Sequence, residues 1–128
     1  ILCEQFESRI QEQIDKKPDS FINFYSMRND DLTIGSRWDN NFIANLCFYI
    51  PKNHANAIIE WHKDYWVPSN YEGNMPTSAS DLFVRSYLKK KIKKKYWIVI
   101  PNLVDHRIGK SAIDKRRSSK RISKTFKG

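Results

Sequence analysis

A five-residue apolar run in the last third of the chain constrains the fold more than any other part of the sequence. Tyr96-Trp97-Ile98-Val99-Ile100 follows six lysines that stand between residues 89 and 95, and Pro101 comes directly after it. The run is short and consists of aromatic and β-branched side chains, which is typical of a strand rather than a helix. Proline cannot donate a further ladder hydrogen bond. The sequence therefore predicts a buried strand over residues 96–100.

Apolar spacing elsewhere predicts that helices and strands alternate. Cys3, Phe6, Ile10 and Ile14 form one helical stripe, which Pro18 ends. Four further elements follow from the same periods: strands over residues 20–25 and 42–50, and helices over residues 51–66 and 80–92. Residues 67–79 carry no period and predict a long loop, of a length that is more often functional than idle. The alternation predicts an α/β fold, a layered sheet with flanking helices.

Composition limits the class of protein. The chain has 128 residues, of which 40% are apolar, and this is ordinary for one globular domain. We expect an α/β core over residues 1–108 and a basic, partly ordered tail over residues 109–128. The longest uncharged apolar-rich run, residues 40–51, is too short to span a membrane. Cys3 and Cys47 lack a CxxC spacing, so they predict reduced thiols in a cytoplasmic protein.

Charge is strongly segregated along the chain. Residues 1–84 hold 7 Lys and Arg against 12 Asp and Glu, whereas residues 85–128 hold 16 against 2. Such a positive field attracts anions, for example nucleic acid, nucleotide diphosphates, phosphorylated glycans or an acidic membrane surface. The lysines of residues 89–95 have a simpler interpretation as well, because cations complement the dipole at the end of a helix.

Few residue patterns point to chemistry. The common dinucleotide, P-loop, zinc-protease and serine-hydrolase motifs are absent from the sequence. Asp105 and His106 follow the predicted strand over residues 96–100, and Asp81 opens a helix directly after the long loop. A carboxylate there can take a proton from a hydroxyl, and a His beside a carboxylate can bind a metal or a phosphate. Equally, Asp81 can be only a first-turn acid and His106 only a surface ring.

Three other features have weaker signals. Trp38 can stack on a sugar or a base, or it can be buried against a neighbouring strand. Asp30-Asp31 resembles a metal-binding pair but lies in an Asn/Asp-rich turn, where such residues bond to the local backbone. His54 and His62 have no acidic partner between them, and we expect both on the surface.

Several of these segments together resemble a known family. They are residues 21–25, Trp38, residues 44–51, Ser80-Asp81-Leu82, and the run Ile100-Pro101-Asn102-Leu103-Val104-Asp105-His106-Arg107 with Gly109-Lys110-Ser111. In this order they resemble the C-terminal, acceptor-side half of bacteriophage-type glycosyltransferases of GT-A fold. The chain is also distantly similar to the lipooligosaccharide and procollagen galactosyltransferase family.

The resemblance implies an activity and a set of residue roles. Such enzymes transfer a sugar from a nucleotide-sugar to a hydroxyl acceptor, usually with Mn²⁺ or Mg²⁺ on the leaving diphosphate. Asp81 would be the catalytic base, His106 would contact the metal or the diphosphate, Arg107 and Lys110 would bind the diphosphate, and Trp38 would bind the acceptor. The family's nucleotide-binding half and DxD motif would lie upstream of Ile1, so we expect an upstream domain or a partner chain.

Two hypotheses of function therefore stand side by side. In the first, Asp81 and His106 converge on one cleft at the carboxyl edge of a sheet and transfer a sugar. In the second, the chain is a non-enzymatic protein that binds nucleic acid, another polyanion or a virion through its basic last third.

Overall fold

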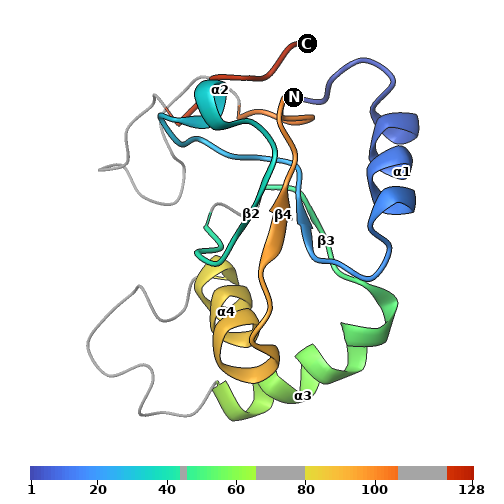
Figure 1. Cartoon of the computed structure of the whole chain (residues 1–128). Coiled ribbons are helices and arrows are strands. Elements are labelled where there is room, and N and C mark those ends of the chain that lie inside the picture. Colours follow the sequence, from blue (N-terminus) through green and yellow to red (C-terminus); the bar gives the residue numbers. More distant parts are fainter. Residues whose placement is uncertain (44–45, 66–79, 107–120) are drawn as a thin grey trace.

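The computed structural model describes residues 1–43, 46–65, 80–106 and 121–128, and the fold is α/β (Figure 1). A four-stranded mixed sheet lies at its centre, in the order β2-β4-β1-β3. The strands are β1 (Ile22–Asn23), β2 (Arg37–Asp39), β3 (Phe48–Tyr49) and β4 (Tyr96–Ile98). β1 and β4 are parallel, whereas β3 and β2 run antiparallel to them on the two outer sides. The predicted α/β class with helices around a sheet is confirmed.

Helix α1 (Phe6–Lys16) covers one face of the sheet (Figure 1). Its apolar stripe, Phe6, Ile10 and Ile14, packs on a buried cluster that the sheet and the chain beyond β4 supply. That cluster consists of Cys3, Ile22, Phe24, Val99 and Leu103. The spacing of 3 to 4 residues thus forms a helix because it places three large side chains on the same apolar surface. Both cysteines are free thiols.

Helices α3 (Ala55–Tyr65) and α4 (Ser80–Ser86) lie together beyond the end of the sheet that is far from the chain termini (Figure 1). A 3-10 turn, Lys52–His54, leads into α3, and a π-helical turn, Tyr87–Ile92, continues α4. Their core consists of Phe21, Phe42, Ile58, Val84, Tyr87, Leu88, Tyr96 and Ile98. In β4 the residues alternate between the two faces, so Tyr96 and Ile98 pack here while Trp97 joins the α1 side.

Three predicted strands are shorter than the sequence indicates, among them residues 96–100, of which only Tyr96–Ile98 pair, and two elements were missed. Of residues 20–25 only Ile22–Asn23 pair, and of the described part of residues 42–50 only Phe48–Tyr49 pair. Helix α2 (Asp31–Ile34) and strand β2 lie in a segment that the sequence predicts as a polar loop. Within the described ranges no helix is long and apolar enough to cross a bilayer.

Candidate functional site

The parallel strands β1 and β4 end at the same edge of the sheet, the edge at which open α/β folds commonly bind ligands. The chain continues from β1 into Tyr25 and Ser26, and from β4 into residues 99–106. Both segments run toward the end of the molecule where the two termini lie (Figure 1). The predicted pair Asp105 and His106 therefore follows a strand of the parallel pair, as the sequence indicates.

His106 is half-buried beside the ring of Tyr25. The two ring centroids lie 5.2 Å apart at 87°, an edge-to-face contact. Burial lowers the pKa of His106 below its ordinary 6.5, and the Arg121 cation lowers it further against the opposing effect of Asp105. The imidazole is therefore mostly neutral at pH 7 and keeps one lone pair to bind a cation or accept a hydrogen bond.

Asp105 holds the backbone around His106. Its Oδ1 accepts hydrogen bonds from the backbone N–H of His106 at 2.7 Å and of Ser123 at 2.8 Å. Its own backbone pairs with Ile1, whose N-terminal ammonium donates to the Asp105 carbonyl at 2.8 Å. The carboxylate of Asp105 therefore fastens residue 123 to the segment that carries His106, and its backbone holds Ile1 beside them.

The last part of the predicted tail packs onto the same edge. Asn102 donates from Nδ2 to the Ser26 carbonyl at 2.5 Å and to Ser123 Oγ at 2.7 Å, and its backbone N–H donates to Thr125 Oγ1 at 3.0 Å. The Tyr25 hydroxyl donates to the Arg121 carbonyl at 2.8 Å. Burial and the nearby Asp105 raise the pKa of Tyr25 to about 12, which keeps this donor protonated. Part of the region expected as a tail thus belongs to the fold, and residues 107–120, including Arg107 and Lys110, lie outside the described residues.

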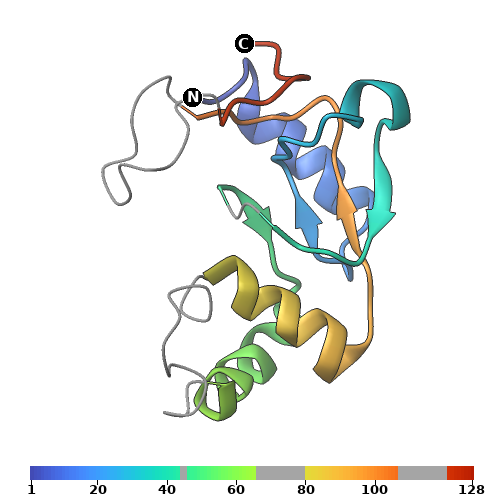
Figure 2. The ribbon, with the colours of Figure 1, turned by 90° about the vertical axis from the view of Figure 1, so that its left-hand side faces the viewer.

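Asp81 stands in the first turn of α4, half-buried, and its Oδ1 accepts the backbone N–H of Leu82 at 3.1 Å. In Figure 2 the start of α4 and the end of the segment after β4 lie on the same, left-hand side of the molecule. They stand at different heights there, with β3 between them. The segments that carry Asp81 and His106 therefore share a side of the molecule without lying next to each other.

Trp38 is placed elsewhere. It belongs to β2, an outer strand of the sheet, and β2 lies at the right of Figure 2, away from the start of α4. The side chain is 45% exposed. The structure therefore does not bring Trp38, the expected acceptor-binding residue, together with Asp81 and His106.

The described residues offer little to a metal ion. Among them no three or more His, Cys, Asp or Glu side chains gather in a way that could hold one. Asp31, half of the acidic pair, is fully buried and accepts the Arg28 backbone N–H at 3.0 Å and the Arg37 guanidinium at 2.8 Å. This carboxylate stabilises the connection between α2 and β2 and is already paired with the Arg37 cation.

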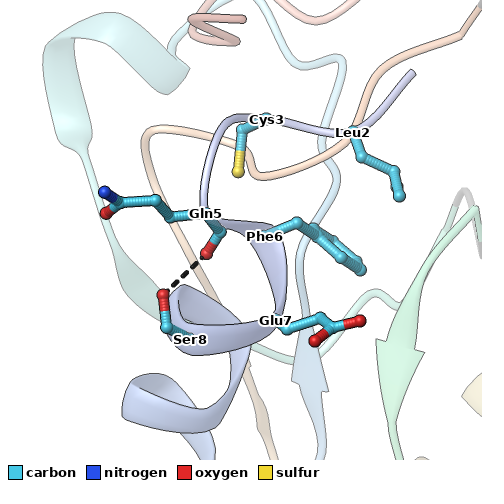
Figure 3. A pocket seen from close by; sticks show the side chains of 6 residues that line it. All are labelled: Leu2, Cys3, Gln5, Phe6, Glu7 and Ser8. Carbon is cyan, nitrogen blue, oxygen red and sulfur yellow. Dashed lines mark hydrogen bonds between the residues drawn. The ribbon is translucent and has the colours of Figure 1, made fainter.

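A hollow of about 470 Å³ opens at the start of α1 (Figure 3). It is lined by Leu2, Cys3, Gln5, Phe6, Glu7 and Ser8. The Ser8 hydroxyl donates to the Gln5 carbonyl at 2.9 Å, which closes the first helical turn. These six residues include neither a histidine nor a cation, so the hollow does not match the chemistry expected from the sequence.

Two polar residues differ from the sequence analysis, because Asp39 was not singled out there and His54 was expected on the surface. Asp39 accepts from Arg28 at 2.5 Å and from the Tyr96 hydroxyl at 2.9 Å. Burial raises the pKa of Asp39, but these hydrogen bonds outweigh that effect and lower the pKa to about 2. His54, expected on the surface, is half-buried, and its Nδ1 lies 2.9 Å from the Tyr87 hydroxyl. Residues this far apart in the chain leave no periodic signal, and only the alternation of Arg37 and Asp39 around Trp38 hints at an inward-facing charge.

The fold and this edge define an α/β domain with a mixed sheet and a histidine at the carboxyl ends of its parallel strands. Comparison with models of known protein families, with curated proteins and with solved structures finds no match for the chain.

Proposed function

We propose that the chain forms the acceptor-side part of a glycosyltransferase, which moves a sugar from a nucleotide-sugar to a hydroxyl. The observation that carries the proposal is the common side of the molecule on which α4 begins and the segment after β4 ends (Figure 2). In Figure 2, α4 runs away from this side toward β4, and the segment after β4 runs back to it.

The two residues have complementary chemistry for this reaction. Asp81 supplies a carboxylate in the first turn of α4, and its role is to accept the hydroxyl proton. His106 follows β4 at the edge where an anionic donor group would lie, and its role is to donate a hydrogen bond from the imidazole N–H to the diphosphate. The described residues do not complete a cation site around it.

The test uses the full-length gene product with a panel of nucleotide-sugars, each with Mn²⁺ or Mg²⁺ and with glycan extracts as acceptors. Release of nucleoside diphosphate is measured. Asp81→Asn keeps the shape of the side chain but removes the base, so transfer should fall about 10²- to 10⁴-fold. The matched control is Asp15→Asn, an exposed position on α1, which should transfer at the wild-type rate. Transfer by Asp81→Asn at the wild-type rate, or no release with any nucleotide-sugar, contradicts the proposal.

A further inference from the structure

Two tryptophans form a pair at the outer strand of the sheet. Trp38 of β2 and Trp97 of β4 are register partners, with ring centroids 5.1 Å apart at 68°. The neighbours of Trp38 fix its direction, because Arg37 and Asp39 point to the opposite face, where they bind Asp31 and Arg28. Trp38 is thereby held outward, and 45% of its surface remains exposed.

A lysine already occupies part of this aromatic surface. Lys17, the residue after α1, places Nζ 4.3 Å from the ring centroid of Trp97 and 5.0 Å from that of Trp38. These are cation–π distances, so a positive charge is fixed against the two indole rings. A ligand that contacts the exposed part of Trp38 therefore also lies close to the positive charge of Lys17.

More cations surround the adjoining hollow. It has a volume of about 310 Å³ and is lined by Asp19, Ser20, Phe21, Trp38, Lys94 and Lys95. Lys94 and Lys95 are exposed, as are Lys89, Lys90, Lys91 and Lys93 just before them. The left-handed Lys93 and the hydrogen bond from the Lys94 N–H to the Leu88 carbonyl turn the chain from the π-helical turn toward β4. Both lysines of the hollow are therefore carried by a fixed stretch of backbone.

From this juxtaposition we propose that Trp38, Lys17, Lys94 and Lys95 form a binding site for single-stranded nucleic acid. One base stacks on the exposed part of Trp38, and the flanking phosphates bind the lysines. A flat apolar ring next to fixed positive charges matches a polymer in which flat bases alternate with phosphates. The hollow is at the small end of ligand sites, which suits one base rather than a larger folded ligand.

This site is independent of the sugar-transfer proposal. β2 lies on the other side of the molecule from the start of α4, so neither Asp81 nor His106 takes part in it (Figure 2). An anionic glycan is the competing ligand, because sugars also stack on indole rings. It lacks the aromatic base, however, and the test separates the two.

Binding is measured with the full chain by fluorescence anisotropy of a labelled oligothymidylate of about 20 nucleotides, at several salt concentrations. Trp38→Ala should weaken binding about 5- to 150-fold, the loss of one stacked base. The variant Lys94→Gln with Lys95→Gln should also reduce the slope of log affinity against log salt by about 1.4, because two phosphate contacts are lost. Far-UV circular dichroism checks that the variants fold.

The matched control removes the same charge at the opposite end of the molecule, by Lys124→Gln with Lys127→Gln. The control double variant should bind the oligothymidylate more tightly than the Lys94→Gln and Lys95→Gln double variant does. Equal losses for the two double variants, or wild-type binding by Trp38→Ala, overturn the site. Displacement of the oligonucleotide by heparin at equal phosphate or sulfate concentration, with the same dependence on Trp38, overturns the choice of nucleic acid. Each of these outcomes is independent of whether Asp81→Asn abolishes transfer.

Discussion

Replacing Asp39 by Asn should destabilise the fold measurably, and the size of the effect follows from its contacts. The carboxylate accepts hydrogen bonds from Arg28, Tyr96 and the Asn41 backbone N–H. Against the effect of burial, the contacts with Arg28 and Tyr96 lower its pKa from 3.8 to about 2. That difference corresponds to about 2 kcal/mol at most, since the pair is partly exposed and water screens it.

The stabilising effect of Asp39 should depend on pH. Because the folded-state pKa of Asp39 is depressed, its contribution is fully present above about pH 5 and is lost as the pH falls toward 2. In urea unfolding at pH 7, Asp39→Asn should be less stable than the wild type by about 1 to 2 kcal/mol. The difference should shrink steadily between pH 5 and pH 2. Asp15→Asn is the control, and as an exposed substitution it should change stability by less than about 0.5 kcal/mol. An Asp39→Asn variant as stable as the wild type at pH 7, with the same pH dependence, refutes the reasoning.

Two further predictions concern the edge that carries His106. Replacing Asn102 by Ala removes the donor to the Ser26 carbonyl and to Ser123 Oγ and leaves these buried partners unpaired. The variant should lose about 1 to 3 kcal/mol of unfolding free energy in urea, and amide exchange of residues 121–126 should be faster. Unchanged amide exchange in residues 121–126 would contradict the hydrogen-bond network. The His106 imidazole should titrate below 6.5 by NMR, and Arg121→Gln should raise its pKa because a nearby cation is lost; a value above 6.5 in the wild type contradicts the described surroundings.

The elements that the sequence predicts well are those with a strong local pattern. Of the predicted stripe, Phe6, Ile10 and Ile14 lie on α1, whereas Cys3 precedes the helix and belongs to the cluster on which it packs. The apolar run ending before Pro101 contains β4, because its side chains fit a buried strand on both faces. In these cases the pattern and the packing require the same conformation.

The elements that the sequence missed depend on contacts between distant residues. α2 and β2 have only 4 and 3 residues, too few for a periodic signal, and the Asp31–Arg37 ion pair joins them. His54 lies against Phe21 and beside the Tyr87 hydroxyl, because the 3-10 turn before α3 and the π-helical turn after α4 come together. The composition of residues 121–126 is that of a solvated tail, yet Ser123 and Thr125 are buried because Asn102 offers them partners.

The candidate site was foreseen in part. Asp105 and His106 follow β4 as expected, but the sequence could not show that Asp105 bonds to the backbone on both sides of the edge. Nor could it show that Trp38 pairs with Trp97 on a strand that lies away from the start of α4. The direction of an outer strand is set by its ion pairs, and these are formed only in the folded chain.

The central claim is that two sites on different sides of this molecule have different functions: Asp81 takes part in sugar transfer, and Trp38 binds nucleic acid. Nucleoside diphosphate release by the Asp81→Asn and Trp38→Ala variants of the full-length gene product, measured side by side, tests it most directly. The account predicts a loss of at least about 100-fold for Asp81→Asn and a wild-type rate for Trp38→Ala. Equal losses in both variants, or full transfer by Asp81→Asn, would contradict it.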